Sequence, residues 1–381
     1  MTEAGVPAAP KPGDPMLAAF YEGPGRAAVR TVPVPAIGPG EALVQMQACG
    51  LCGSDALDWY MAPRAPFVFG HEPAGIVVAV GEGVTNFRPG HRVFVHHHAP
   101  CGNCEFCRRG EEVHCPTWRS TNLTPGGLAE YFRVPAVNLA HDTLPLPPDV
   151  SFAQGSLVEP VACGVKALDR AGIGPGTSVL IVGLGFMGQA MGYLCRQEGA
   201  GPLLGTDLVP DRLDRAKAWA DHVLPAGEAD PAPAGPAKDS GDKPGPNPRL
   251  IQQVREITGG HGVDVAVVVP AGEAALLTGI AAVRPNGRVV MFSPPAPEAD
   301  IQLPLSDMFF REVTLIPSYS AGPDHTRRAL KAVAEGHVPD SELITHYFPL
   351  DRIGEAYALL RDPRREALKI VVTPSSGGSP A

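Results

Sequence analysis

The chain has no excess of basic residues. Its 381 residues carry a formal net charge of -9, and its lysines and arginines form no run longer than a pair. A nucleic-acid-binding face needs clustered positive charge, so this balance argues against a nucleic-acid partner. The chain also has no run of 18 or more apolar residues, and its first 15 residues lack the basic and apolar regions of a secretory signal. We therefore expect a cytoplasmic protein with no membrane partner, long enough for two domains.

The eight cysteines do not suit a disulfide framework, because the cytosol keeps thiols reduced. Four of them lie close together in the sequence, at Cys101, Cys104, Cys107 and Cys115. This spacing can close a tetrahedral shell around one zinc ion, which is the structural kind of zinc site. An iron–sulfur cluster and a nucleic-acid-binding zinc ribbon are the alternatives, and the acidic chain disfavours the ribbon. Since four thiolates complete the shell, we expect exposed or packing roles for His96, His97 and His98.

A second group of potential metal ligands precedes this lobe. Cys52, His71 and Glu72 lie on turns bounded by glycines, and zinc selects thiolate, imidazole and carboxylate donors. A catalytic zinc ion takes three protein ligands and leaves one position open, so we expect a further ligand, Glu159. Taken alone, Cys52 could be a buried small side chain and His71 a turn histidine. Glu159 could serve only the dipole of the helix that it begins.

A nucleotide-binding pattern starts near residue 178. The β-rich run SVLIVG leads into Gly183, Gly185 and Gly188, with Phe186 and Met187 between them, and a helix-compatible stretch follows. The glycines allow a tight turn, a close approach to a pyrophosphate and tight helix–strand packing. The helix N-terminus then faces the phosphates with unpaired amides.

The next strand-like run, PLLGTD, ends in Asp207, 19 residues after Gly188. A carboxylate there can accept hydrogen bonds from the adenosine ribose and would repel a 2′-phosphate, which favours NAD over NADP. Arg212 is a possible ribose or phosphate neighbour, or only a solvated helix residue.

Strand-like and helix-like runs alternate from residue 178 to residue 318, which predicts a parallel, doubly wound sheet in an α/β domain. The Pro-, Gly- and Ala-rich segment 225–248 interrupts this pattern, and we expect a disordered surface insert there. The segment before it is mostly β, and the strand-like runs after residue 319 are expected to return to that first domain. The predicted domains are therefore 16–163, 164–318 and the return segment 319–381.

The ordered motifs resemble the zinc-dependent medium-chain dehydrogenase/reductase family of alcohol and polyol dehydrogenases, in particular its sorbitol-dehydrogenase-like members. The resemblance rests on GLCGSD, GHEPAGIVVAVGEGV, RPGHRV, the four-cysteine lobe, VEP before a helix, GLGFMG and FPLDRIGEAYALL. It covers nearly the whole chain except the leader, the insert and the tail. It implies a GroES-like β-rich catalytic domain with two zinc ions, a Rossmann domain for NAD, and a homodimer or homotetramer.

The resemblance also assigns roles to single residues. It implies that Cys52, His71 and Glu159 hold the catalytic zinc ion, that Glu72 lies beside it, and that Asp55 orients the histidine. Ser54 matches the hydroxyl that passes on the substrate proton. Many members have a histidine where this chain has Leu57, so the proton route beyond Ser54 must differ, through Asp58, the cofactor ribose and water or otherwise.

The function expected from these motifs is hydride transfer between NAD and a small secondary alcohol, such as a polyol or sugar alcohol. Zinc would lower the pKa of the alcohol, and the Rossmann domain would hold the nicotinamide against its carbon. A primary-alcohol or threonine-type dehydrogenase is one alternative. A non-catalytic NAD-binding zinc scaffold is another.

Overall fold

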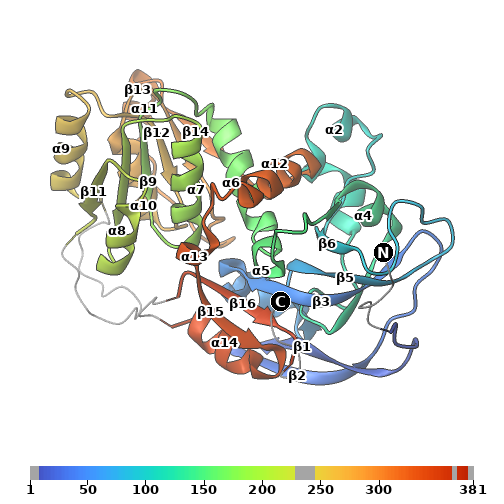
Figure 1. Ribbon diagram of the computed structural model, residues 1–381. Coiled ribbons are helices and arrows are strands. Elements are labelled where there is room, and N and C mark those ends of the chain that lie inside the picture. Colours follow the sequence, from blue (N-terminus) through green and yellow to red (C-terminus); the bar gives the residue numbers. More distant parts are fainter. Residues whose placement is uncertain (1–7, 228–244, 363–366, 376–381) are drawn as a thin grey trace. The chain divides into compact units, whose positions relative to one another are not determined.

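The computed structural model describes residues 8–227, 245–362 and 367–375, and these form two compact units. The first unit comprises residues 1–162 and 321–381, and the second comprises residues 163–320. The first unit is therefore built from both ends of the chain, while the second is continuous (Figure 1). Most of the predicted insert, residues 228–244, lies outside the described residues; Pro225 ends strand β11 and Pro248 begins helix α9.

The first unit consists mainly of two sheets. One has the strand order β2-β1-β4, and the other has the order β15-β16-β3-β5-β6-β8, with β7 also paired to β3. The strands are β1 Pro15–Gly23, β2 Arg26–Pro33, β3 Ala42–Leu51, β4 Phe67–Val68, β5 Glu72–Val80, β6 Arg92–Val95, β7 Tyr131–Val134, β8 Thr143–Pro145, β15 Ile344–Pro349 and β16 Lys369–Thr373.

Short helices connect these strands. The α-helices are α1 Asp58–Met61, α2 Glu105–Arg108, α3 Pro116–Ser120, α4 Ala136–His141, α5 Phe152–Gly155, α12 Pro323–Ala334, α13 Asp340–Leu343 and α14 Ile353–Leu360. The 3-10 helices are η1 Gly53–Ala56, η2 Ala62–Arg64, η3 Glu112–His114 and η4 Leu350–Arg352. The longer helix α6, Val158–Ala171, begins in the first unit and ends in the second.

Strand β3 is the centre of the larger sheet. It pairs antiparallel with β5 on one side and with β16 on the other, so that Gly50 lies opposite both Glu72 and Val371. Almost all of its side chains are buried, in a core that also contains Tyr357 of α14. Apolar burial of this kind, at roughly 25 cal/mol per Å², is the main force that joins the C-terminal segment to the N-terminal one.

The second unit is the predicted parallel sheet flanked by helices. Its strand order is β11-β10-β9-β12-β13-β14, every neighbouring pair is parallel, and the order reverses beside β9, as in a doubly wound fold. The strands are β9 Val179–Val182, β10 Leu203–Asp207, β11 His222–Pro225, β12 Val263–Val268, β13 Val283–Met291 and β14 Thr314–Pro317. The helices are α7 Phe186–Gln197, α8 Pro210–Ala216, α9 Pro248–Ile257, α10 Glu273–Ala282 and α11 Leu305–Phe310.

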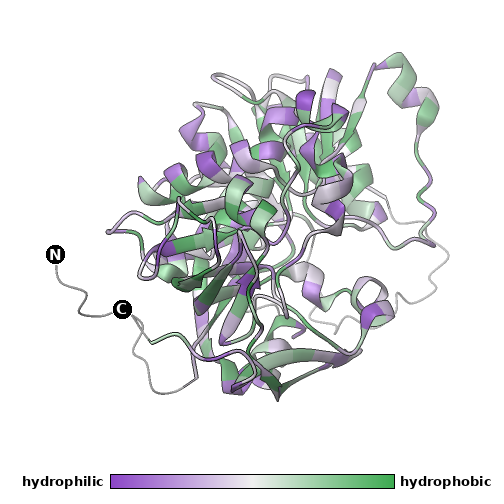
Figure 2. Ribbon diagram, turned by 90° about the vertical axis from the view of Figure 1, so that its right-hand side faces the viewer, coloured by the Kyte–Doolittle hydropathy of each residue, from purple (hydrophilic) through white to green (hydrophobic). Residues whose placement is uncertain are grey.

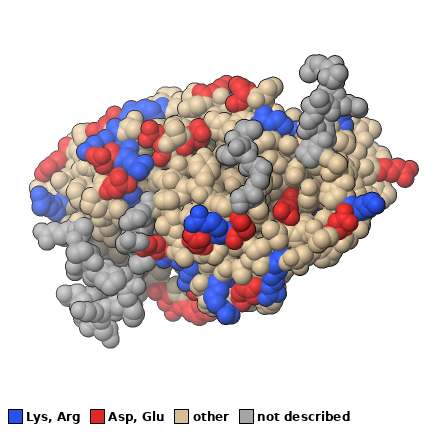
Figure 3. Space-filling model, turned by 60° about the horizontal axis from the view of Figure 1, so that its bottom comes forward, with Lys and Arg blue, Asp and Glu red and all other residues tan. Residues whose placement is uncertain are grey.

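The helices of the molecule carry green and purple bands in Figure 2, as expected for helices with one apolar face. In α9 the apolar face consists of Leu250, Ile251 and Val254, which join the core of the second unit. On the face of the molecule drawn in Figure 3, acidic and basic side chains are interspersed. No helix among the described residues is long and apolar enough to span a membrane.

Candidate active site

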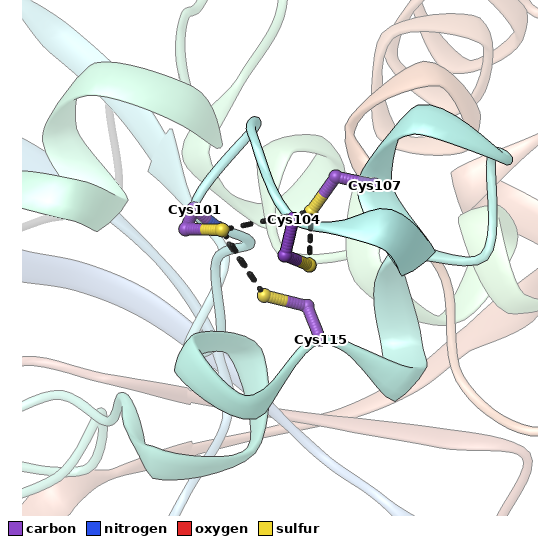
Figure 4. A group of neighbouring side chains, drawn as sticks. All are labelled: Cys101, Cys104, Cys107 and Cys115. Carbon is purple, nitrogen blue, oxygen red and sulfur yellow. Dashed lines mark hydrogen bonds between the residues drawn. The ribbon is translucent and has the colours of Figure 1, made fainter.

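The four cysteines of the lobe converge as their spacing predicts (Figure 4). The sulfur atoms of Cys104 and Cys107 lie 3.5 Å apart, those of Cys101 and Cys115 3.6 Å, and those of Cys101 and Cys107 3.9 Å. Four sulfurs at about 2.3 Å from a tetrahedral zinc ion would be roughly 3.8 Å from one another. The lobe therefore fits a closed structural zinc site, and the buried Trp118 packs against it.

A second cluster forms where strands β3 and β5 lie side by side. Cys52 follows β3, His71 precedes β5 and Glu72 is the first residue of β5, and their ligand atoms lie within 4.8 Å of one another. A methyl group at Gly50, opposite Glu72, would lie 1.9 Å from Glu72 Oε2. Gly70 has a φ of +90°, which favours glycine, and it turns the chain into β5. These glycines make the close approach possible.

Glu159 lies in the first turn of α6 and is buried, with 5% of its surface exposed. Its charge interacts with that of His71, so it is a neighbour of the first cluster. It also lies close to His96 and His97, with one potential ligand atom of each residue within 4.8 Å of the others. Among the described residues, the grouping that contains both Cys52 and His71 is completed by Glu72, and Glu159 lies next to it.

The histidine run lies between the lobe and the first cluster. His96 is completely buried, and it approaches Glu159 to 3.9 Å between Nε2 and Oε1, while the ring centroid of His97 lies 5.1 Å from that of His71. Two of the three histidines thus belong to the immediate surroundings of the cluster. All three also make the packing contacts that were expected: His96 with Phe94 and Trp118, His97 with His98, and His98 with Trp118.

Asp55 holds the first cluster in place. Its Oδ1 lies 3.5 Å from His71 Nδ1, and its Oδ2 accepts a hydrogen bond of 3.0 Å from the backbone N–H of Cys52. Burial raises the pKa of the Asp55 carboxyl, although His71 and the Cys52 amide oppose the shift. The geometry suits a carboxylate that fixes the orientation of the imidazole.

Burial disfavours the charged form of His71, but the negative groups around it have the opposite and larger effect. Asp55, Cys52 and Glu159 together raise the pKa of His71 well above its usual value. Burial likewise raises the pKa of Glu159. This concentration of buried acceptors is the electrostatic environment in which a divalent cation is stabilised.

Lys369 is the residue that the sequence analysis missed. It begins β16 with 2% of its surface exposed, and its Nζ lies 2.7 and 2.9 Å from the two carboxylate oxygens of the fully buried Glu72. It also donates to the backbone carbonyl of Leu51 at 3.1 Å. Burial works against its charge, but Glu72 raises the pKa of Lys369. The sequence feature that could have revealed it is a single lysine at the start of an otherwise apolar strand.

The predicted proton-handling residues lie next to the cluster. Ser54 is half-buried in η1, two residues after Cys52. Asp58, in contrast, is bound through both oxygens by Arg361, at 3.0 and 2.9 Å, and it accepts a hydrogen bond of 3.2 Å from Tyr21. A carboxylate engaged in this way serves the packing of α14 against α1.

In the second unit, the glycine-rich loop joins β9 to α7. Gly183 has a φ of +89°, and a methyl group at Gly188 would lie 2.0 Å from the Gly183 carbonyl oxygen. Gly185 precedes α7 directly, so Phe186 and Met187 form its first turn, with Phe186 buried. The loop thus has the tight turn and close packing expected of a dinucleotide-binding loop.

Asp207 lies at the end of β10, beside this loop. Its Oδ2 accepts a hydrogen bond of 2.6 Å from the backbone N–H of Leu184, and its Oδ1 accepts one of 2.9 Å from Val209. Arg212 Nη1 lies 3.9 Å from Asp207 Oδ2, and its guanidinium lies beside Gly185. Both predicted cofactor residues therefore flank the loop, with opposite charges.

Comparison with known proteins agrees with this geometry. Residues 38–147 match the alcohol dehydrogenase GroES-like domain, and residues 187–335 match the zinc-binding dehydrogenase family. Human sorbitol dehydrogenase is 30% identical over 92% of this chain and 93% of its own length, and sorbitol dehydrogenase of Bacillus subtilis is 29% identical over 91% and 94%. A crystal structure of a zinc-binding dehydrogenase from Sinorhizobium meliloti bound to NADP is 26% identical, with a TM-score of 0.78 and coverage of 95% and 100%.

The resemblance, the α/β fold class and the assignment as a zinc enzyme with a nicotinamide cofactor are confirmed. Because the match to human sorbitol dehydrogenase covers 92% of this chain, it extends over both units. The chain belongs to the zinc-dependent medium-chain dehydrogenase family, among its sorbitol-dehydrogenase-like alcohol and polyol dehydrogenases.

Proposed function

We propose that this enzyme oxidises a secondary alcohol of the polyol or sugar-alcohol type with NAD. The observation that carries the proposal is the cluster of the half-buried Cys52 and His71 with the buried Glu72, with Glu159 adjacent and no second thiolate within the group. A carboxylate-containing set is the one that the sorbitol-dehydrogenase-like resemblance implies for hydroxyl-rich substrates. The sorbitol dehydrogenases and the D-xylulose reductase of Aspergillus clavatus among the relatives support that substrate class.

The residues would divide the work as follows. Cys52, His71 and one carboxylate, Glu159 or Glu72, would hold a zinc ion, which supplies Lewis acidity toward the alcohol oxygen. Asp55 keeps the imidazole oriented, since it contacts both His71 and the Cys52 amide.

Proton removal is the second task. We infer that Ser54 takes the proton of the alcohol, and its half-buried position two residues from Cys52 supports this role. Beyond Ser54 the proton would pass to the cofactor ribose and water, since Leu57 carries no proton and Asp58 is engaged by Arg361.

A substrate panel tests this proposal. Zinc-loaded protein is assayed with sorbitol, xylitol, a primary alcohol and threonine, each with NAD and with NADP, at alkaline pH. We expect the highest kcat/KM for a polyol with NAD. The expected control is Cys52→Ser, which should lose the activity but keep the zinc ion of the four-cysteine lobe. A preference for threonine or a primary alcohol would establish the alternative substrate class, and no turnover of any alcohol would refute the proposal.

NADP is the competing cofactor, and a specific observation favours it. The guanidinium of Arg212 lies 3.9 Å from Asp207 and could bind a 2′-phosphate, as such a cation does in NADP enzymes. We still propose NAD, because the buried Asp207 carboxylate lies closest to the loop, 2.6 Å from the Leu184 amide. Asp207→Ala should then lower kcat/KM for NAD by about tenfold to a hundredfold and raise it for NADP, which corresponds to roughly 1.4–2.8 kcal/mol. Unchanged kcat/KM values would exclude a role for Asp207.

We further propose a cytoplasmic homodimer or homotetramer. Helix α11 exposes Leu305 by 67%, Phe309 by 76% and Phe310 by 81%, and it precedes β14, the edge strand of the second sheet. Exposed apolar groups next to an unpaired strand edge are typical of subunit contacts. Light scattering should give a multiple of 39.8 kDa for the wild type and a smaller mass for a Phe309→Ser/Phe310→Ser variant. A monomeric wild type would refute the oligomer.

A further inference from the structure

Gln189 is a buried polar residue near the start of α7, directly after the last glycine of the glycine-rich loop. Only 1% of its surface is exposed, and the residues that follow it, Ala190 and Met191, are apolar and completely buried. Helix α7 lies next to β10 and α8 (Figure 1). A buried amide is costly unless its polar atoms have hydrogen-bond partners, so the partners of Gln189 show what it connects.

The side chain of Gln189 bonds to three separate segments. Its Nε2 donates to the backbone carbonyls of Leu184, at 3.1 Å, and Arg212, at 2.8 Å, and its Oε1 accepts a hydrogen bond of 2.7 Å from the indole nitrogen of Trp219. Because an indole N–H can only donate, it fixes which end of the amide is the oxygen. The amino end must then face the two carbonyls. One side chain thus joins the glycine-rich loop to helix α8.

Trp219 gives this amide a rigid support. Its surface is 1% exposed, a methyl group at Gly192 would lie 2.3 Å from its ring, and one at Gly205 would lie 3.2 Å from it. The backbone carbonyl of Trp219 also accepts a hydrogen bond of 3.0 Å from Arg196 Nε. The ring therefore has no room to move toward α7 or β10, and the orientation of the Gln189 amide is fixed with it.

The two carbonyls belong to the two segments that flank the cofactor loop. Leu184 lies within the glycine-rich loop, and its N–H donates to Asp207 Oδ2 at 2.6 Å while its carbonyl accepts from Gln189. Arg212 follows Asp207 in α8, and its guanidinium lies beside Gly185. In a dinucleotide-binding fold the loop approaches the pyrophosphate and the residues after the next strand approach the ribose. Gln189 therefore fixes the spacing between these two parts of the site.

We propose that Gln189 is a positioning residue for the nicotinamide cofactor. It holds the glycine-rich loop and the segment of Asp207 and Arg212 at the separation that one dinucleotide requires, before the cofactor binds. A site that is ordered in advance does not lose affinity to the cost of ordering it. The inference rests on the proposed binding of NAD and is independent of which alcohol is oxidised. If Gln189 served packing alone, the loss of either set of its hydrogen bonds would affect stability and not cofactor affinity.

Two reciprocal variants of the full-length, zinc-loaded protein test this inference. Gln189→Glu keeps an oxygen for Trp219 but loses the amino group that faces the two carbonyls, whereas Trp219→Phe removes the indole donor and keeps that amino group. The Kd of NADH is measured by titration of NADH fluorescence, and Tm by circular dichroism. We expect both variants to lower Tm, but the Kd to rise about tenfold in Gln189→Glu and less than about threefold in Trp219→Phe. Gln197→Glu, at the exposed end of α7, is the matched control for the added charge and should leave both values unchanged.

Steady-state kinetics give a second readout. Gln189→Glu should raise KM for NAD about tenfold and change kcat less than about twofold, because the lost bonds affect the binding of the cofactor and not the metal cluster. An unchanged Kd in folded Gln189→Glu, or an equal rise in Trp219→Phe, would overturn the inference. If Gln189→Glu does not fold, the uncharged Gln189→Met takes its place, and failure of both to fold would make the role structural and overturn the inference too. A wild type that does not bind NADH would instead refute the proposed cofactor, and the same comparison is then made with NADPH.

Discussion

The buried pair of Lys369 and Glu72 makes a sharp prediction about stability. Lys369→Met removes a cation that is 2% exposed and leaves the completely buried Glu72 without its two short contacts of 2.7 and 2.9 Å. The same change removes the donor to the Leu51 carbonyl at 3.1 Å. Methionine has nearly the volume of lysine, so the cavity contribution is small.

The magnitude follows from the charge left behind. Removing one member of a buried ion pair costs about 3–5 kcal/mol, because the remaining charge is neither hydrated nor paired. A single backbone acceptor left unsatisfied adds about 1–3 kcal/mol. We therefore expect Lys369→Met to lower the free energy of unfolding of the metal-free protein by at least about 3 kcal/mol.

Urea denaturation followed by circular dichroism measures this loss in chelator-treated protein, because a metal ion bound to Glu72 would compensate for the lost lysine. The double variant Lys369→Met/Glu72→Gln is the essential control, since it removes both charges and should recover part of the stability. A loss below about 1 kcal/mol for Lys369→Met, or no recovery in the double variant, would refute the reasoning.

Three further predictions concern other parts of the molecule. Gly188→Ala would place a methyl group 2.0 Å from the Gly183 carbonyl oxygen, so it should weaken NADH binding at least about tenfold in a fluorescence titration, whereas Gly174→Ala, with no atom within 4 Å, should not. Partial burial opposes ionisation of Asp264, but hydrogen bonds from Ser178 and the pairing with Arg284 lower its pKa. Because the pKa of Asp264 is lower in the folded protein, its carboxylate stabilises the fold at pH values above the unfolded-state pKa of about 3.9, and this stabilisation is lost as the pH falls through the folded-state pKa. Asp264→Asn should therefore flatten the acid side of the Tm–pH curve, and an unchanged slope would contradict this. Cys107→Ser should lower the zinc content by one ion per chain and the urea midpoint with it, and retention of full zinc content would exclude Cys107 as a ligand.

Features encoded within a short stretch were readable from the sequence. The cysteine lobe and the glycine-rich loop are local, since their spacing alone fixes which atoms can meet. Cys52, His71 and Glu72 were also found, because each lies in a turn or at the start of a strand beside a glycine. The α/β class followed from the alternation of strand-like and helix-like runs.

Contacts between distant segments were not readable. Lys369 lies 297 residues from Glu72, and only the pairing of β16 with β3 brings them together. The hydrogen-bonded series from Thr326 through Asp142 to His96 also joins distant segments, because Thr326 lies 184 residues from Asp142 in the sequence. The acidic neighbours of His96, Asp142 and Glu159, could not be predicted for the same reason, because other segments supply them.

The first unit is formed from two separate segments of the chain, and this has a consequence for biosynthesis. The continuous second unit can begin to fold once residue 320 has left the ribosome, but the end of β3 at Cys49–Leu51 lacks its pairing with β16 until residues 369–373 are made. Until then the nascent chain carries an uncovered stretch of strand edge together with a Glu72 side chain that lacks its lysine partner. Quality control in the cell should therefore discriminate sharply between full-length protein and products that stop shortly before Lys369.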